Sequence, residues 1–333
     1  MPLTHAPKKL TAYGAWGMGA IGLVALFVWL LSAYSPATLV TQLFHGLITS
    51  MVLILISSGL TFVAGILHVI NISHGVLYAL GAFLGVSIAL AASDVCVGSV
   101  CVESFWFALI GAPIGVGIVG ALLERFTISH IYSRDPIYSL LLTLGLTLIL
   151  TRIIELIWGT DPLAFSTPAF GKGLVNLGFM YYPTYRLFVL LASAVVVAVT
   201  WLFLRMTNFG LIMRAGVYDP QIVSALGINL PRIFTKVFAF GAMLAAIAGV
   251  IVSPMRSVAP EMGNLVIIDA FIVLVIGGMG SFRGAVIGAL LLGISQSLGA
   301  LIVPGFAQIM VYVVMVAVLL VRPQGLFGEA QLH

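Results

Sequence analysis

Long runs of apolar residues, separated by short polar connections, dominate this chain. One crossing of the hydrocarbon core of a bilayer takes roughly 20 apolar residues as an α-helix. Strands of a membrane barrel would alternate apolar and polar residues, and these runs are continuous. The pattern predicts an all-α polytopic membrane protein with about ten transmembrane helices, at residues 13–34, 43–67, 76–92, 105–123, 137–157, 185–204, 237–255, 265–281, 284–302 and 306–321.

The composition supports a single membrane-embedded domain over residues 1–333. Hydrophobic residues make up 62% of the chain and charged residues only 7%. Soluble domains are roughly 45–50% apolar and about 25% charged, so this chain could not cover a water-exposed surface. Small residues recur at four-residue spacing, as at Gly81 and Gly85 or Gly241, Ala245 and Gly249, which predicts close helix packing.

The distribution of basic residues predicts the orientation. With the N-terminus in the cytoplasm and ten crossings, three basic residues fall outside (Lys172, Arg186 and Arg256), and Arg152 lies within a span. Cytoplasmic connections carry the excess of Lys and Arg in membrane proteins, so both termini are predicted to be cytoplasmic. This use of basic residues also accounts for the net charge of +4 without nucleic acid as a partner. Ten basic residues fall inside: Lys8, Lys9, Arg125, Arg134, Arg205, Arg214, Arg232, Lys236, Arg283 and Arg322.

Cys96 and Cys101 lie in one predicted outer loop. An oxidising compartment would permit a disulfide between them. Two unpaired cysteines in a loop are the alternative.

Catalytic and metal-binding motifs are missing from the sequence. It contains no H-E-x-x-H or C-x-x-C pattern, and Gly171-Lys172 lacks the other residues of a phosphate-binding loop. We therefore expect no enzyme activity, no metal site and no cofactor in this chain.

Ionisable residues within the spans are few and lie near their outer ends: Arg152, Glu155 and Asp269. A carrier driven by an ion gradient usually needs a deeply buried ionisable group, and a channel needs a charged ring or a filter. The pattern favours a pore whose energy comes from another subunit, while an ion-gradient-driven carrier remains the alternative.

Two interruptions of the apolar runs are candidates for the transport pathway. The first, 68–75, holds four polar side chains and no full charge, which is unusual for a solvated turn. The second, 277–285, holds four glycines within eight residues, which a regular helix tolerates poorly. Irregular backbone at membrane depth is tolerated where it lines a cavity, and paired interruptions in inverted repeats point to a transport path. If spans 2–5 and 7–10 are repeats, we expect the two interruptions to correspond, although plain turns are the alternative. The predicted pathway residues are Asn71, Ser73, His74, Gly75, Gly277, Gly278, Gly280 and Ser281.

The longest predicted cytoplasmic loop, 205–236, is a candidate docking segment. It can form a short amphipathic helix that ends at Gly227, with Pro231 blocking its continuation. Such a helix could dock into the groove of a cytoplasmic partner, although an ordinary basic loop would show similar features. The predicted coupling residues are Arg214, Ala215, Asp219, Ala225, Leu226, Gly227, Ile228 and Pro231.

Several motifs, taken together, resemble those of permease subunits of branched-chain amino-acid (Liv-type) ABC importers. The resemblance covers nearly the whole chain after the first span. It rests on Gly59-Leu60-Thr61, Val69 to Tyr78, Gly81-Ala82, Glu124-Arg125, Thr143-Leu144-Gly145-Leu146, Arg214-Ala215, Asp219, Leu226 to Asn229, Pro260 to Gly263, Gly277 to Ala285 and Arg322 to Leu326.

This resemblance implies an architecture like that of the vitamin-B12-type importers, with ten helices and the coupling loop between the sixth and seventh. It implies a second permease subunit, identical or homologous, two cytoplasmic ATP-binding subunits and an extracytoplasmic solute-binding protein. ATP would be bound by those partner subunits, and the chain would lie among lipids of a bacterial inner membrane. Branched-chain or other hydrophobic amino acids are the implied substrates.

One segment departs from the family pattern. The family often carries an R-P-L-R sequence after the Glu-Arg pair, whereas 129–136 reads Ser-His-Ile-Tyr-Ser-Arg-Asp-Pro here. Because related permeases also move urea, amides and aromatic acids, these substrates remain alternatives.

Overall fold

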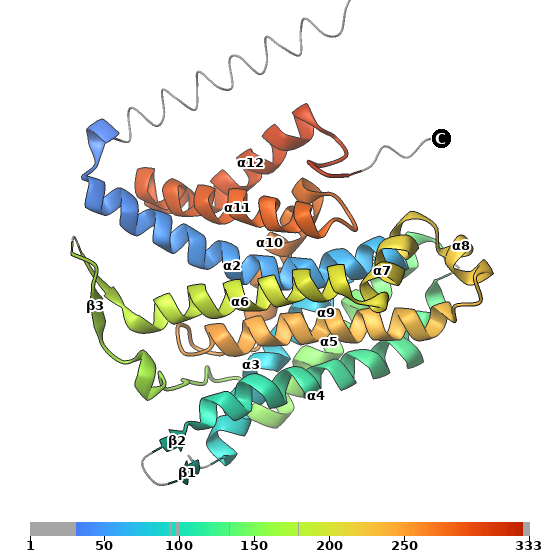
Figure 1. The fold of residues 1–333 in the computed structure, drawn as a ribbon, viewed down its shortest axis with the longest axis horizontal. Helices are drawn as coiled ribbons and strands as arrows, with labels where there is room; N and C mark the ends of the chain where they lie inside the picture. The colour runs from blue at the N-terminus through green and yellow to red at the C-terminus, as the bar shows by residue number, and fades with distance from the viewer. Residues whose placement is uncertain (1–30, 93–94, 98–99, 133, 179, 329–333) are drawn as a thin grey trace, which may run out of the picture.

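The computed structural model describes residues 31–328, apart from 93–94, 98–99, 133 and 179. This part of the chain is a helical bundle with two small hairpins and short 3₁₀ turns in its connections (Figure 1). The helices are α2 (Pro36–Leu67), α3 (His74–Ala91), α4 (Ser104–Phe126), α5 (Pro136–Trp158), α6 (Thr184–Met206), α7 (Asn208–Tyr218), α8 (Pro220–Ala225), α9 (Leu230–Val252), α10 (Met262–Gly277), α11 (Phe282–Ile302) and α12 (Ala307–Val321). The hairpins pair β1 (Val95–Val97) with β2 (Val100–Val102) and β3 (Leu174–Asn176) with β4 (Tyr181–Pro183), and the 3₁₀ turns are η1 (Ile128–Ile131), η2 (Ala169–Gly171) and η3 (Pro304–Phe306).

The predicted helical, polytopic architecture is confirmed. Seven helices of the described residues are long and apolar enough to cross a membrane, and α10 and α12 are shorter apolar helices. Each of these nine helices coincides with one predicted span, within several residues at the ends. The first predicted span, 13–34, lies almost entirely outside the described residues.

Local sequence fixes where several helices begin. Ser35, Asp135 and Asn229 each precede a helix, and their side-chain oxygens accept a hydrogen bond from a backbone N–H of its first turn. A proline follows each of these caps within two residues, where its missing N–H removes nothing from the helix. Pro231 thus occupies the first turn of α9 and starts that helix, beyond the predicted role of blocking the preceding one.

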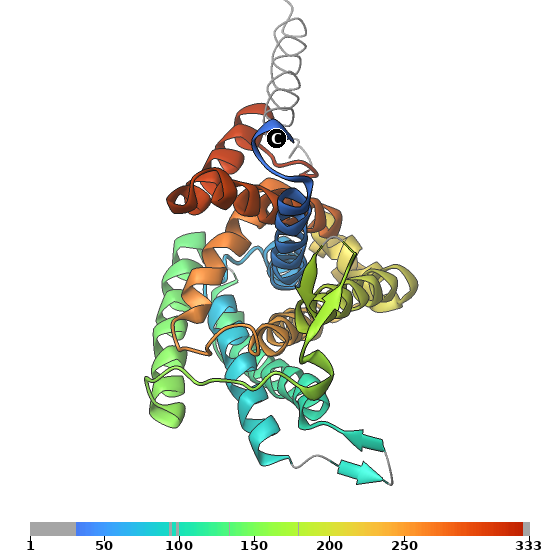
Figure 2. The same ribbon diagram turned by 90° about the vertical axis from the view of Figure 1, so that its left-hand side faces the viewer.

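The connections gather at two opposite ends of the bundle. The hairpins β1–β2 and β3–β4 lie at one end, and α7 and α8 lie at the other (Figure 1). Figure 2 looks onto the end with the hairpins. Following the predicted orientation, we name the end with α7 and α8 the cytoplasmic end and the opposite end the extracytoplasmic end.

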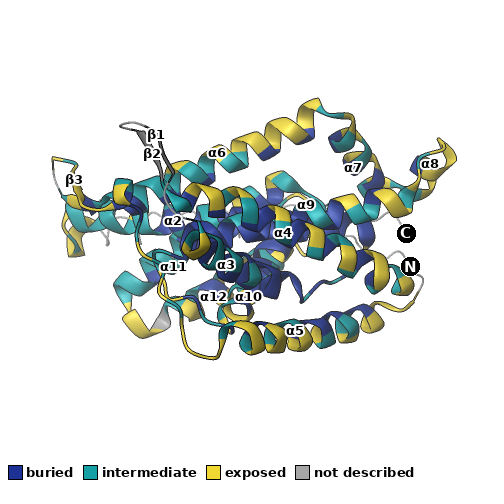
Figure 3. Ribbon diagram, turned by 90° about the horizontal axis from the view of Figure 1, so that it is seen from below, coloured by how far each residue is buried: buried dark blue, intermediate teal, exposed yellow. Residues whose placement is uncertain are grey.

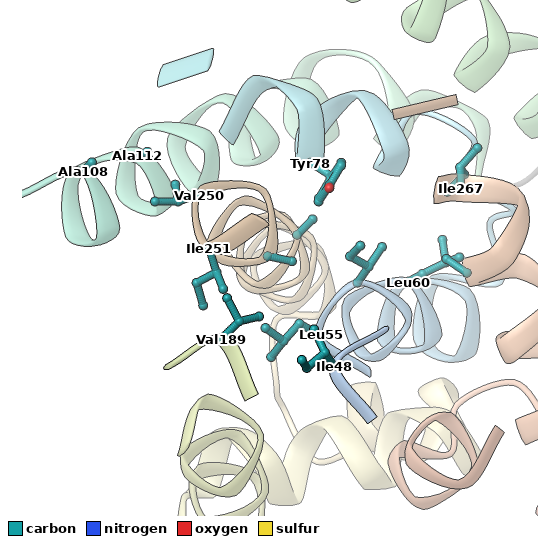
Figure 4. Close-up of a cluster of buried hydrophobic side chains, with 14 of the residues drawn as sticks. Ile48, Leu55, Leu60, Tyr78, Ala108, Ala112, Val189, Val250, Ile251 and Ile267 are labelled. Atoms are coloured by element: carbon teal, nitrogen blue, oxygen red, sulfur yellow. The ribbon is translucent and has the colours of Figure 1, made fainter. Parts of the chain in front are cut away.

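Burial is concentrated in α2 and its neighbours. The most apolar window of α2 is 89% buried, compared with 22% for α5 and for α6 (Figure 3). Figure 4 shows the largest core cluster, in which side chains of α2, α3, α4, α6, α9 and α10 converge. The apolar faces of α5 and α6 are exposed in this single chain. In a membrane they would contact lipid or another subunit and not water.

Small residues allow helix backbones to touch, as the four-residue spacing predicts. A Cβ added to Gly81 on α3 would lie 2.4 Å from the Cα of Ala246 on α9. One added to Gly249, on the same face of α9, would lie 2.2 Å from the carbonyl oxygen of Tyr78. Neither position therefore has room for a larger residue.

Candidate transport pathway and coupling segment

The first predicted interruption is an irregular segment that returns into the bundle. α2 ends at Leu67, and His68 follows in the left-handed conformation with φ 53°. The ring Nε2 of His74, at the start of α3, lies 3.1 Å from the carbonyl oxygen of Ile56. Since Leu67 lies about 16 Å beyond Ile56 along the helix, residues 68–73 run back beside α2 over much of that length. The interruption is therefore not a turn at the end of two straight spans.

A threonine of α5 holds this returning segment. The Thr143 hydroxyl oxygen accepts a hydrogen bond from the backbone N–H of Ile72 and lies 3.2 Å from the carbonyl oxygen of Ile70. Backbone groups away from water need such partners, and this side chain supplies one for the Ile72 N–H while its own hydroxyl lies closest to the Ser139 carbonyl oxygen, at 2.8 Å. Thr143 belongs to the motif Thr143-Leu144-Gly145-Leu146, and the sequence alone did not reveal this role.

Three of the four polar side chains of the first interruption are buried, and His68 is exposed. Asn71 and Ser73 are fully buried and His74 is 1% exposed. The Ser73 hydroxyl donates to Asn71 Oδ1 at 2.6 Å, and the Asn71 amide nitrogen has no hydrogen-bond partner within the described part of the chain. Gly75 packs against Gly263 of α10. These four predicted pathway residues therefore lie inside the packed bundle.

The second interruption is a tight turn closed by the end of the chain. Gly278 and Gly280 have φ values of 92° and 79°, and the Ser281 hydroxyl caps α11 by accepting from the N–H of Gly284. Leu326 N and Phe327 N donate to the carbonyl oxygens of Ile276 and Gly277, at 2.7 and 3.1 Å. The motif from Arg322 to Leu326 thus leads the chain back to cap α10, a role that the sequence did not disclose.

The expected correspondence of the two interruptions is wrong. The first joins α2 to α3, and its counterpart in an inverted repeat must join α9 to α10, which is the connection 253–261. The second interruption joins α10 to α11 and corresponds to the outer connection between α3 and α4. Gly75 and Gly263, the second residues of α3 and α10, pack against each other. In such a repeat, this contact would join the equivalent starts of α3 and α10.

A large cavity opens at the cytoplasmic end, with a volume of about 1420 Å³. Its walls come from the ends of α2 and α6, from α7, from both interruptions and from the C-terminal segment. Gly280 and Ser281 are the predicted pathway residues that line it. A Cβ on Gly65 of α2 would lie 2.3 Å from the Cα of Gly280, so this part of the second interruption rests directly on α2.

The cavity wall combines arginines with apolar side chains. Arg205, Arg214 and Arg283 line it, and none of the described residues lining it is Asp or Glu. Phe62 and Phe282 also line it, with their rings stacked at 6.0 Å between centroids. Such a wall can hold a small molecule that has both an anionic and an apolar part.

The predicted coupling loop consists of two helices at a bend. It spans 207–229 rather than 205–236, because α6 continues to Met206 and α9 begins at Leu230. The Asp219 carboxylate caps α8 by accepting from the N–H groups of Gln221 and Ile222. α8 ends at Ala225, and Gly227 adopts φ 80°, the left-handed conformation that its position after the helix predicts.

Some of the other predicted coupling residues are exposed, whereas others make contacts within the fold. Arg214 donates to the carbonyl oxygen of Leu204 and so ties α7 to the end of α6. Ala215, Ala225 and Leu226 are exposed, Ile228 is half-buried, and Pro231 starts α9.

Glu124, part of the Glu124-Arg125 motif, is a buried carboxylate that links three parts of the fold. It is 1% exposed, and its two carboxylate oxygens accept from the hydroxyls of Tyr132 and Thr235, both at 2.5 Å. Burial, followed by the hydrogen bond and the negative charge of Glu124, raises the pKa of Tyr132 above its usual value. The carboxylate joins α4, the connection after η1 and α9 near the cytoplasmic end.

At the extracytoplasmic end the backbone register of the β1–β2 hairpin places Cys96 directly opposite Cys101.

A carboxylate links two connections at this end. The Glu103 carboxylate accepts from the N–H groups of Ala169 and Phe170, at 2.9 and 3.4 Å. This contact joins the connection before α4 to the long connection before α6.

Comparison with known proteins identifies the family of this chain. The family model described as the branched-chain amino acid transport system permease component matches residues 42–320. The chain belongs to this family. The high-affinity branched-chain amino acid transport system permease protein LivH of Escherichia coli is 28% identical over 88% of this chain and 96% of its own length.

Two further similarities extend the comparison. BraD of Pseudomonas aeruginosa, a permease protein with the same description, is 30% identical over 88% of this chain and 96% of its own length. Among solved structures, PsaBC from Streptococcus pneumoniae in complex with Fab aligns over 90% of this chain and 94% of that chain, with 12% identity and a TM-score of 0.43. The family membership rests on the sequence matches, and it makes the chain a multi-pass membrane component of a transport system.

Proposed function

We propose that this chain is the transmembrane permease subunit of an ATP-driven importer, which moves branched-chain or other hydrophobic amino acids into the cytoplasm. The family match supports the substrate class and the type of importer. In this proposal two cytoplasmic subunits bind ATP, a soluble protein outside the membrane delivers the substrate, and a second permease subunit completes the pore. Both chain termini face the cytoplasm of a bacterial inner membrane.

The observation that carries the proposal is an apolar ridge on α7–α8 at the cytoplasmic end. Tyr218 at the end of α7, Ile222 on α8 and Leu226 just after α8 are 71%, 60% and 74% exposed, and together we name them the apolar ridge. This bend lies at the cytoplasmic end and protrudes beyond the ends of the spanning helices (Figure 1). Exposed apolar side chains of this kind mark a protein interaction site. A groove of a cytoplasmic ATP-binding subunit is the partner that fits a short helix with such a ridge.

Copurification and transport test the proposal. The tagged permease should retain its ATP-binding subunits in detergent, and vesicles of the whole importer should accumulate radiolabelled leucine only with ATP and the binding protein. Ile222→Glu should release the ATP-binding subunits and abolish uptake, because a buried unpaired charge would face their groove. Gln221→Glu, one residue away and outside the ridge, is the matched control. Uptake that continues without ATP and collapses with a protonophore would contradict the proposal.

A further inference from the structure

Within residues 31–328, no carboxylate pairs with the arginines of the cytoplasmic cavity. Arg205, Arg214 and Arg283 line it, and the described lining residues include no Asp or Glu. The ion pair of Arg152 with Glu155 lies at the other end of the bundle, near the outer end of α5. The cavity is therefore a region of positive charge that can take up an anionic group.

Two of these arginines are held in place and keep free donors. The Arg205 guanidinium lies 5.2 Å from the centre of the Trp201 ring, which also lines the cavity. Arg214 is anchored through one N–H to the carbonyl oxygen of Leu204. A guanidinium carries five N–H donors in a planar fork, which matches the two oxygens of a carboxylate.

The end of α2 supplies the opposite polarity in the same cavity. Ala64, Gly65 and Ile66 in its last turn all line the cavity, and this turn contains no basic residue. At the ends of α3 and α10 the next backbone N–H caps the helix, whereas at α2 His68 turns into the left-handed conformation. The last carbonyl groups of a helix point beyond its end and carry a partial negative charge, which favours an ammonium group.

Between these two polar regions lies an apolar wall. Phe62 and Phe282 stack on each other, and Val69 and Met213 also line the cavity. Such a surface suits a branched aliphatic side chain, for which burial is favourable in proportion to its apolar area.

We propose that this cavity is a weak binding site for a zwitterionic, apolar amino acid on the cytoplasmic side of the membrane. The arginines take its carboxylate, the carbonyl end of α2 takes its ammonium group, and the wall of Phe62 and Phe282 takes its side chain. This inference rests on the proposed function. It adds which protein groups bind the carboxylate, the ammonium group and the side chain of the substrate. Because the arginines are exposed to solvent, binding is weak and weakens further as salt rises.

Equilibrium binding tests the proposal. The whole importer, without its binding protein, is placed in nanodiscs and titrated with radiolabelled L-leucine, with a Kd expected near the millimolar range. Isocaproate lacks the ammonium group and leucinamide lacks the carboxylate, so each should compete at least about tenfold more weakly than leucine. Arg283→Gln should weaken leucine binding about three- to tenfold, and so should Arg205→Gln on a different helix. The matched control is Arg232→Gln, which removes one positive charge at the same end but outside the cavity.

The outcomes separate this proposal from the proposed function. Absence of saturable leucine binding, equal binding of isocaproate and leucine, or equal effects of Arg283→Gln and Arg232→Gln would each overturn it. ATP-driven uptake is measured on the same preparation with the binding protein added. Normal leucine uptake with any of those results rejects the cavity site alone, whereas a complex that imports no amino acid rejects the proposed function.

Discussion

Gly75 and Gly263 touch backbone to backbone at the junction of the two halves of the bundle. A Cβ added to Gly75 would lie 2.4 Å from the carbonyl oxygen of Gly263, and one added to Gly263 would lie 2.3 Å from that of Gly75. Each is the second residue of a helix that follows an irregular connection, 68–73 before α3 and 253–261 before α10. If α2–α5 and α9–α12 are inverted repeats, this contact joins equivalent points of the two.

Replacing either glycine by alanine should reduce the amount of folded protein. The added methyl group has no space, and overpacking of this kind costs about 1–3 kcal/mol. Thermal stability in detergent and the folded yield on size-exclusion chromatography measure the effect. Gly145→Ala is the control, because nothing lies within 4 Å of its added Cβ. Equal stability of Gly75→Ala and Gly145→Ala would show that this contact does not hold the halves together.

The sequence predicts the elements well because helices in a membrane are determined by local composition. A continuous apolar run indicates a span, and Asp219-Pro220 or Asn229 followed by Pro231 marks a helix start through bonds within four residues. Gly227 is likewise predictable, because a helix end needs a left-handed residue nearby.

Features that depend on distant residues could not be predicted in this way. The depth of the first interruption depends on Thr143 of α5 and on the carbonyl oxygen of Ile56, neither of which is near it in sequence. The cytoplasmic cavity depends on Arg205 and Arg283, which belong to helices that only tertiary packing brings together. The glycines of 277–285 likewise indicated an interruption, but not that Leu326 and Phe327 of a distant segment bond to it.

Gly227→Val should impair coupling without preventing assembly in the membrane. A β-branched residue at φ 80° costs roughly 1–2 kcal/mol, which would shift the end of α8 although no atom lies within 4 Å of the added Cβ. ATP-driven uptake should fall while the amount of permease in the membrane stays near that of the wild type. Gly227→Asn should retain most uptake, since asparagine tolerates the left-handed conformation. Full uptake by the valine variant would exclude a coupling role for this bend.

Labelling of α8 should establish the orientation. Ser224 is exposed on α8, whereas Gly216 on α7 is buried and would label poorly on either side. In a background with both native cysteines changed to serine, Ser224→Cys should resist a membrane-impermeant thiol reagent in intact cells and react in inverted vesicles. Reaction in intact cells would place α7 and α8 outside and reverse the predicted topology.

Cys96 and Cys101 should form a disulfide in the mature protein. Residues directly opposite in an antiparallel pair have Cα atoms about 4.5 or 5.5 Å apart, within the range of about 4.4–6.8 Å that disulfides span. Closing so short a loop contributes about 2 kcal/mol in the chain-entropy model. Alkylation of the denatured protein should label neither cysteine until a reductant is added. Labelling of both without reductant would show that the hairpin carries free thiols.

Substitutions at two adjacent residues of the second interruption, Gly278 and Met279, should have different effects. One should impair assembly and the other transport. Met279 is 62% exposed and lines the cytoplasmic cavity, so Met279→Trp adds bulk to the cavity without disturbing the core. Gly278 has φ 92°, and a Cβ there would lie 2.5 Å from the backbone nitrogen of Gly328, so Gly278→Leu displaces the C-terminal segment. We expect Met279→Trp to assemble normally and to lower uptake per assembled complex severalfold, with basal ATP hydrolysis retained. Gly278→Leu should instead lower the amount of assembled complex in proportion to its loss of uptake. If Met279→Trp transports at the normal rate per complex, substrate does not pass this wall, and the pathway must run along another face of the bundle.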